Sequence, residues 1–216
     1  MTNYLIPLAT ALLLTSACHA ADTTPAPKPA AAKPAAAAPA ASPAPTAAAA
    51  ALPRWVQASA GSSLTFTFDQ AGAASKGSFK QFSTELAYDD KSPAAGSLNV
   101  KVQIATIDTQ DQERNDMLVG PDLFDAPKFP VAQYAGTLAR TAAGGLEAVG
   151  KLTMRGVTRD LRLPLKIVRT ATGLELSGAT AIKRLDYGVG QGDWKSTDGV
   201  ADEVKIQYKV ALVAAK

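Results

Sequence analysis

The sequence predicts an all-β fold, an eight-stranded antiparallel β-barrel with a short helical insertion after the third strand. Apolar and polar residues alternate with a period of two over most of the chain after residue 62, as in strands that bury one face. Short glycine-containing turns separate neighbouring runs. Consecutive antiparallel strands with one apolar face must close or sandwich to hide that face. Closure at about eight strands gives an interior that is either filled by side chains or able to hold one ligand.

The first twenty residues have the layout of a secretory signal. An apolar block from Leu5 to Leu14 is followed by small residues around Ser16 and Ala20. The block is about half as long as the ~20 residues that a membrane-spanning helix needs. We therefore expect residues 1–20 to direct export and not to span a membrane.

The segment contains two alternative processing sites, and the sequence does not decide between them. The stretch Thr15-Ser16-Ala17-Cys18 resembles the lipobox at which bacterial lipoproteins are cleaved and acylated on cysteine, although Thr15 stands where that pattern prefers leucine. Ordinary signal-peptidase cleavage after Ala20 fits equally well, because Cys18 and Ala20 are both small. The first alternative anchors the mature protein to the membrane surface through an acylated Cys18, and the second releases it in soluble form.

Residues 21–52 are nearly all alanine and proline. Prolines between positions 25 and 45 remove hydrogen-bond donors and clash with preceding carbonyls, so the alanines cannot propagate a helix. Such a segment is a semi-rigid, extended spacer with a reach on the order of 100 Å. We therefore expect the folded domain to occupy residues 53–216.

The residue types that are missing exclude most enzyme classes. The chain has one histidine, His19, and one cysteine, Cys18, so the expected domain contains neither. This excludes a Ser-His-Asp triad, a thiolate nucleophile and a His/Cys metal centre. A hydrolase or isomerase based on carboxylates remains as an alternative. The aspartates, however, lie in loop-like segments where turn and capping roles are usual, so we expect neither an enzyme nor a cofactor.

The charge pattern also excludes nucleic acid as a partner. The formal net charge of +3 is small, and the chain has no run of basic residues interleaved with aromatics.

The predicted elements follow one another in the order strand, strand, strand, helix and five further strands. The strands are expected at residues 63–69, 76–89, 98–106, 131–138, 146–153, 159–168, 174–182 and 204–213. In the second strand the alternation changes phase near Phe82, which indicates a bulge or bend. Residues 110–123 suit one or two helical turns bordered by Gly120-Pro121. A long irregular loop is expected at residues 183–199.

We expect the barrel to hold an apolar ligand, because aromatic residues concentrate on the apolar strand faces and the two irregular loops could cover an opening. The candidate wall residues are Phe66, Phe68, Phe79, Phe82, Val102, Ile104, Leu163, Leu165, Ile206 and Tyr208. The candidate lid residues are Met117, Leu118 and Phe124, with Tyr187 and Trp194 in the second loop. The alternative is a barrel filled by its own side chains that serves protein contacts at the cell envelope.

Two charged pairs stand in these loops. Arg114 and Asp116 belong to the expected helix, and Arg184 and Asp186 to the second loop. Each pair is expected either to stabilise its own loop or to contact the polar end of a ligand. An exposed ion pair of this kind contributes less than ~1 kcal/mol.

Several motifs resemble those of the YceI-like family of bacterial periplasmic proteins. In addition to Trp55, the matching stretches are Gly77-Ser78-Phe79-Lys80-Gln81-Phe82, Ile107-Asp108-Thr109, Arg114-Asn115-Asp116-Met117-Leu118, Phe124-Asp125-Ala126-Pro127-Lys128-Phe129-Pro130 and Gly150-Lys151-Leu152-Thr153-Met154-Arg155-Gly156-Val157-Thr158-Arg159. They cover nearly the whole expected domain in the family's order. One departure is Arg114-Asn115 followed by Met117-Leu118, where many members have Arg-Asp and then His-Leu, so any polar role of that histidine is absent here.

The resemblance implies a lipocalin-like barrel in the periplasm that carries or sequesters a long apolar lipid, such as a polyprenyl lipid or a quinone. Burial of each CH₂ group is worth ~0.8 kcal/mol, so such a tail has ample driving force to leave water. Competition with the bilayer then limits net transfer. The implied partner is an isoprenoid-type lipid, bound without any other cofactor. The oligomeric state stays open, with a dimer among the alternatives.

Overall fold

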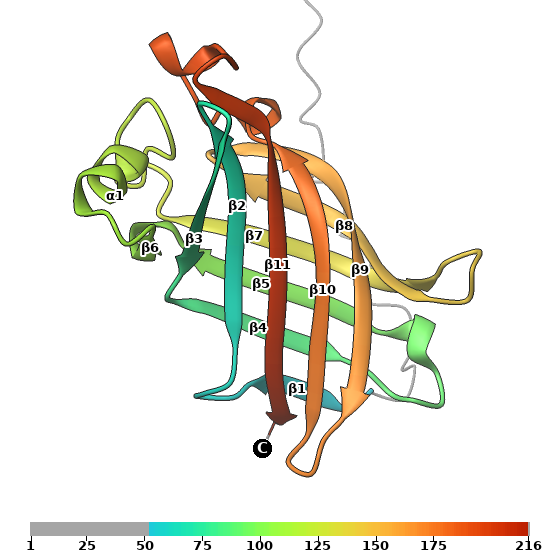
Figure 1. Ribbon diagram of the computed structural model, residues 1–216. Helices are drawn as coiled ribbons and strands as arrows, with labels where there is room; N and C mark the ends of the chain where they lie inside the picture. Colours follow the sequence, from blue (N-terminus) through green and yellow to red (C-terminus); the bar gives the residue numbers. More distant parts are fainter. Residues whose placement is uncertain (1–51, 216) are drawn as a thin grey trace, which may run out of the picture. The chain divides into compact units, whose positions relative to one another are not determined.

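The computed structural model describes residues 52–215, which form a β-barrel (Figure 1). The strand segments are β1 (Arg54–Gln57), β2 (Ser63–Gln70), β3 (Ala73–Phe79), β4 (Phe82–Ala87), β5 (Ser97–Gln103), β6 (Ile107–Asp108), β7 (Val131–Arg140), β8 (Leu146–Met154), β9 (Val157–Arg169), β10 (Leu174–Lys183) and β11 (Val200–Ala214). The predictions for the signal, the lipobox at Cys18 and the spacer lie outside the described residues.

The segments form one antiparallel sheet in the order β1-β4-β5-β7-β8-β9-β10-β11-β2-β3-β6, and the pairing of β1 with β11 closes it. β1 and β2 follow each other along β11, so they act as two halves of one barrel strand. β3 and β4 form a second broken strand, and β5 and β6 a third. Eleven segments less these three joins give eight strands, so the predicted eight-stranded barrel is confirmed.

The break between β3 and β4 confirms the predicted bend of the second strand. It falls at Lys80 and Gln81, directly before Phe82. Sequence periodicity did not predict β1 as a strand, because four residues are too few to establish an alternation.

The predicted helical insertion is confirmed as α1 (Gln112–Val119). Its N-cap is Asp111, whose side chain accepts a hydrogen bond from the backbone N–H of Arg114 at 3.1 Å. The helix ends at Val119 with Gly120 as its C-cap, and Pro121 follows. None of the residues of α1 is buried, so the helix lies at the surface. No helix within residues 52–215 is both long enough and apolar enough to cross a membrane.

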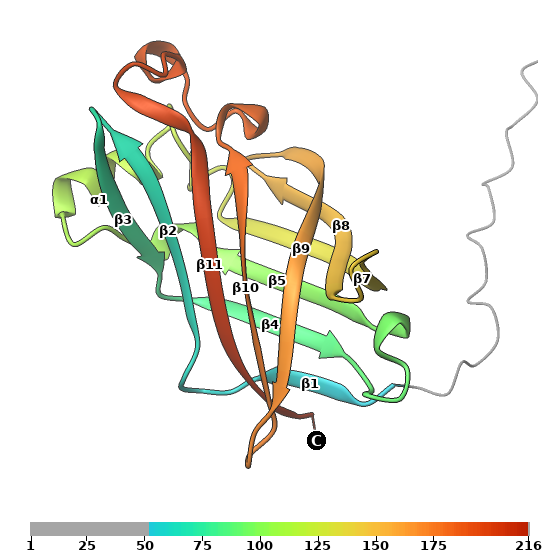
Figure 2. The ribbon, with the colours of Figure 1, turned by 45° about the vertical axis from the view of Figure 1, so that its right-hand side comes forward.

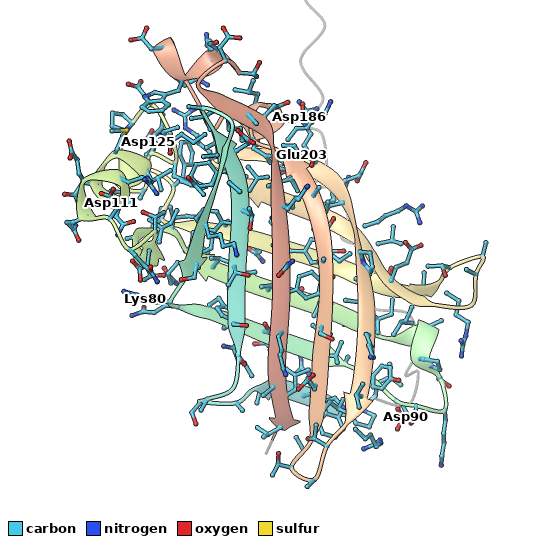
Figure 3. All side chains as sticks on the ribbon, viewed as in Figure 1. Lys80, Asp90, Asp111, Asp125, Asp186 and Glu203 are labelled. Carbon is cyan, nitrogen blue, oxygen red and sulfur yellow. The ribbon has the colours of Figure 1, made fainter. Side chains whose placement is uncertain are left out.

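One end of the barrel is filled by its own side chains. The most deeply buried residues there are Leu86, Leu98, Ala148, Leu174, Leu176 and Leu212. Trp55 packs against this cluster and donates a hydrogen bond from its indole N–H to the carbonyl of Tyr88 at 3.1 Å. Arg169 lies over the Trp55 ring and pairs with Asp90 at 2.5 Å, and Figure 3 shows Asp90 at this lower end. We call it the solid end.

A second cluster lies beneath the loops at the other end. Its buried members are Ile104, Leu123, Ala126, Ala132, Met154, Tyr187 and Val189. The loops that cover it contain α1 and two 3-10 turns, η3 (Leu185–Tyr187) and η4 (Gly192–Lys195). In Figures 1 and 2 these turns lie above the ends of β10 and β11, and α1 lies beside β3. We call this the lid end.

Candidate functional site

A cavity of about 400 Å³ lies inside the barrel between the two clusters. Its lining is mainly aliphatic and aromatic, with inward-facing residues from strands all round the barrel. The volume falls within the ~300–1,000 Å³ that small-molecule pockets occupy. The barrel is therefore hollow in its middle, and the alternative of an interior filled by side chains is wrong.

Most of the predicted wall and lid residues line this cavity. They are Phe66, Phe68, Phe79, Phe82, Val102, Ile104, Met117, Leu118, Phe124, Leu163, Trp194, Ile206 and Tyr208. Two predicted residues do not. Leu165 is buried in the cluster at the solid end, and Tyr187 is buried in the cluster at the lid end. Leu165 lies at the level of the barrel that side chains fill, whereas Tyr187 belongs to η3 and lines a separate groove formed with β9 and β10.

The first charged pair does not form as predicted. Arg114 lines the cavity, but its guanidinium pairs with Asp111 at 3.6 Å and not with Asp116. Asp116 is exposed, does not line the cavity and accepts a hydrogen bond from Gln112 Nε2 at 2.7 Å. The contacts of both residues are therefore local to α1.

The second charged pair does not form either. Asp186 is exposed, and its backbone carbonyl accepts a hydrogen bond from Arg159 Nε at 3.2 Å. Arg184 is buried, with 5% of its surface exposed, and its guanidinium donates to five backbone carbonyls. These belong to Ala201, Val189, Trp194, Ser196 and Val200. Burial lowers the pKa of Arg184, and the Asp202 carboxylate partly counteracts this effect.

Arg184 therefore organises the lid. Its hydrogen bonds join the start of β11 to the segment that contains η3 and η4. Hydrogen bonds from a charged group are worth more than neutral ones, so five of them compensate for burying this cation.

Sequence reasoning missed a second lid residue, Arg155. Its Nη1 donates to the carbonyl of Gly188 at 2.6 Å and its Nη2 to that of Pro121 at 2.5 Å. It thereby links the loop after α1 to the loop after β10. Arg155 has a φ of +50° in the turn between β8 and β9, a conformation rare for residues with a side chain. Arg155 stands in one of the stretches that resemble the family, but nothing in the sequence indicates which distant carbonyls its side chain reaches.

Hydroxyl groups interrupt the apolar wall, and three of them, on Tyr134, Tyr208 and Thr84, are the most informative. Tyr134 donates to the carbonyl of Leu161 at 3.3 Å, and Tyr208 donates to that of Pro164. Burial raises the pKa of Tyr134 to about 12 and also raises the pKa of Tyr208, so both phenols stay neutral near pH 7. Thr84 is 2% exposed, and its Oγ1 has no hydrogen-bond partner among the described residues. The cavity thus offers one buried hydroxyl that a ligand or a water molecule can satisfy.

The cavity reaches the surface beside α1, where the exposed residues Asp111 and Glu113 contribute to its lining. Figure 3 shows Asp111 on this side of the molecule. Within the part of the chain that the structure describes, no three His, Cys, Asp or Glu side chains are grouped to hold a metal ion.

Comparison with known families agrees with this architecture, since the model of the YceI-like domain matches residues 55–212. The chain belongs to the YceI-like family. Among curated relatives, a UPF0312 protein of Yersinia pestis (strain Pestoides F) is 35% identical over 91 residues, which is 42% of this chain and 47% of the relative. A UPF0312 protein of Enterobacter sp. (strain 638) is 31% identical over 115 residues, 50% of this chain and 60% of the relative. The matches thus span about half the length of these relatives.

Solved structures share the YceI-like barrel. BcnA of Burkholderia cenocepacia is similar with a TM-score of 0.66 and 30% identity, over 72% of this chain and 96% of that one. The YCEI protein of Campylobacter jejuni is similar with a TM-score of 0.57 and 26% identity, over 67% of this chain and 86% of that one. A polyisoprenoid binding domain from Saccharophagus degradans shares the fold, with a TM-score of 0.60 and 18% identity over 76% and 99%.

Proposed function

We propose that this YceI-like protein binds an isoprenoid-type lipid inside its barrel and carries or sequesters it. The observation that carries the proposal is the apolar cavity of about 400 Å³. An apolar chain inside it gains ~0.8 kcal/mol for each CH₂ group removed from water. The polyisoprenoid binding domain of Saccharophagus degradans, which has the same fold, supports an isoprenoid as the ligand.

The polar groups of the cavity favour binding over catalysis. The acidic residues in its lining, Asp111 and Glu113, are exposed on the α1 side. A carboxylate mechanism needs an acid and a base on either side of the reacting bond. The tyrosine hydroxyls donate to backbone carbonyls, and the buried cation Arg184 is already bonded to five carbonyls.

We also propose a place of action outside the cytoplasm. The signal-like residues 1–20 would export the chain, and the Ala/Pro-rich residues 21–52 would space the barrel from a membrane anchor at Cys18. Mass spectrometry of the mature N-terminus tests this proposal. An acylated Cys18 supports the anchor, a terminus at residue 21 shows release into the periplasm, and an unprocessed Met1 contradicts export.

The ligand can be identified by solvent extraction of the protein purified from its native host, followed by mass spectrometry. We expect an isoprenoid lipid in stoichiometric amount. Recovery of no isoprenoid, together with no binding of added geranylgeraniol, would contradict the proposal.

A matched pair of variants on β9 tests whether the lipid lies in the cavity. Leu163 lines the cavity, whereas Val168 is 43% exposed on the outside of the barrel. We expect Leu163→Trp to fill the cavity and to weaken geranylgeraniol binding at least tenfold, and Val168→Trp to leave binding unchanged. Equal affinities of the two variants would place the lipid elsewhere.

A further inference from the structure

The floor of the cavity is the level at which the hollow part of the barrel meets the solid end. Leu98, Leu176 and Val210 belong to the buried cluster of the solid end and also line the cavity. On β4, Thr84 is the last residue that lines the cavity before Leu86, which lies within the cluster. Thr84 is therefore a polar residue in a mainly aliphatic floor.

Gln57 of β1 lies beside Thr84 on the inside of the barrel. Figure 1 shows β1 and β4 as neighbours at the solid end, and their last pair is Val56 with Glu85. One step further in the same register, Gln57 stands opposite Thr84. Gln57 also pairs with Leu212, which is buried inside the solid end, so the Gln57 side chain points inward. Residues opposite each other in this way have Cβ atoms ~4.5–5.5 Å apart.

Gln57 and Thr84 each carry a buried oxygen without a hydrogen-bond partner among residues 52–215. These atoms are Gln57 Oε1 and Thr84 Oγ1. The hydroxyls of Tyr134 and Tyr208, by contrast, donate to backbone carbonyls. Buried polar atoms in native proteins nearly always have a partner. Two neighbouring exceptions at the floor indicate that the group completing them comes from outside the chain.

A hydroxyl group can satisfy both atoms at once. It donates one hydrogen bond and also accepts, so it can donate to Gln57 Oε1 while it accepts from the Thr84 hydroxyl. An exchange of oxygen and nitrogen in the Gln57 amide leaves this conclusion unchanged, because both hydroxyls can then reverse their roles. A hydrocarbon end at the same place would leave both atoms without partners.

An anionic end does not fit the floor. The charged residues that line the cavity belong to α1 and the lid end, and they are Asp111, Glu113, Arg114 and Arg184. A phosphate or carboxylate at the floor would therefore be a buried charge without a counter-ion, which is far more costly than a buried hydroxyl.

We infer that Gln57 and Thr84 form a polar subsite at the floor that binds the alcohol end of an isoprenoid. The lipid then lies with its hydroxyl at the floor and its other end toward the opening beside α1. The inference rests on the proposed function and adds the chemical class of the lipid and its direction in the cavity. An alcohol that enters the barrel loses its hydrogen bonds to water, and the subsite replaces them.

Two substitutions remove the polar atoms of the subsite and keep the shape of the side chains. Thr84→Val replaces the hydroxyl with a methyl group, and Gln57→Met replaces the amide with an unbranched apolar chain. Thr137 and Gln133 of β7 are exposed and do not line the cavity. Thr137→Val and Gln133→Met are therefore matched controls.

Competition between an alcohol and its hydrocarbon measures the subsite. Each full-length protein is equilibrated with phosphatidylcholine vesicles that contain equal amounts of geranylgeraniol and of the hydrocarbon in which hydrogen replaces its hydroxyl. Gas chromatography and mass spectrometry of the separated protein give the ratio of bound alcohol to bound hydrocarbon. The two compounds partition into the vesicles in the same way in every experiment, so changes of this ratio between proteins report the subsite.

We expect Thr84→Val and Gln57→Met each to lower the ratio by about tenfold or more, while both controls keep the wild-type ratio. Retained binding of the hydrocarbon shows that a variant is folded and hollow. A wild-type ratio in either Thr84→Val or Gln57→Met overturns the two-residue subsite and leaves the proposed function intact. Absence of both compounds from the wild-type protein overturns the proposed function and the subsite with it. Thr84→Ala replaces Thr84→Val if circular dichroism shows that the valine variant does not fold.

Discussion

Phe66 on β2 lies directly opposite Gly77 on β3, and its ring occupies the space that a side chain at Gly77 would need. The same ring contacts Phe79, with 5.4 Å between the ring centroids, and Phe79 meets Phe124 edge-on at 6.2 Å. The glycine thus lets an aromatic ring lie flat against the wall. The lumen keeps its width because the ring does not project into it.

Gly77→Ala is expected to narrow the cavity. A Cβ at this position would lie 2.3 Å from Phe66 Cζ, so the ring must turn into the lumen. We expect about tenfold weaker binding of geranylgeraniol and a loss of ~1–3 kcal/mol in the free energy of unfolding, as for other overpacked cores. Titration and urea denaturation measure the two effects. Gly199→Ala, where no atom lies within 4 Å of the added Cβ, is the control, and equal binding by both variants would contradict the expectation.

Thr84→Val is expected to stabilise the ligand-free protein. The Thr84 hydroxyl is buried without a partner among the described residues, and an unsatisfied buried group costs ~1–3 kcal/mol. We therefore expect the free energy of unfolding in urea to rise by about 1 kcal/mol. Thr153→Val, which removes the hydrogen bond between Thr153 and Thr158, should lower it. A destabilised Thr84→Val would show that an ordered water satisfies the hydroxyl.

The buried tyrosines predict a loss of stability at alkaline pH. The pKa of Tyr134 rises from 10.0 to about 12 on folding, so the folded state retains a proton that the unfolded state releases. The phenol of Tyr134 therefore makes its full contribution to the free energy of unfolding below about pH 10, and this contribution is lost as the pH rises toward 12. Melting temperatures of the wild type and Tyr134→Phe between pH 8 and 12 test this expectation. The slope against pH should be smaller in the variant, and identical slopes would show that Tyr134 does not contribute.

Arg184→Lys is expected to loosen the lid. A lysine ammonium has three donors and no planar fork, so it cannot replace five hydrogen bonds to carbonyls. We expect the free energy of unfolding to fall by about 3 kcal/mol, in the range for breaking a buried network. Arg162→Lys, at an exposed pair with Glu147, should change it by less than ~1 kcal/mol. Faster amide exchange confined to residues 184–200 in Arg184→Lys would locate the effect, and a free energy of unfolding equal to that of Arg162→Lys would refute it.

The alternation of apolar and polar residues predicts which side of each strand faces inward. It does not predict the height of each residue along the barrel axis. Leu163 and Leu165 share a face of β9, and the alternation treats them alike. Only Leu163 reaches the cavity, because Leu165 lies level with the buried leucines of the solid end. Depth along a barrel depends on strand stagger, which is a property of the closed sheet and not of one strand.

The lid was less predictable than the strands. The capped helix followed from Asp111 and Gly120-Pro121, since caps are local signals. Arg184 was expected to pair with Asp186 or with a ligand, and its partners are backbone carbonyls instead. Every residue has a carbonyl, so residue types do not reveal such a bond. The β9–β10 ladder ends before Pro164, a residue without an N–H that stands inside an otherwise regular alternating run.

The backbone N–H of Ala215 donates to the carbonyl of Arg54 at 2.8 Å, so the first and last strands of the domain meet at the solid end (Figure 1). A short peptide linking residues 215 and 52 would therefore allow circular permutation, with new termini opened in the exposed β7–β8 turn around Gly144. Immobilising the barrel on a sensor surface through residues 52 or 215 would likewise leave α1, and the opening of the cavity beside it, in contact with the solution.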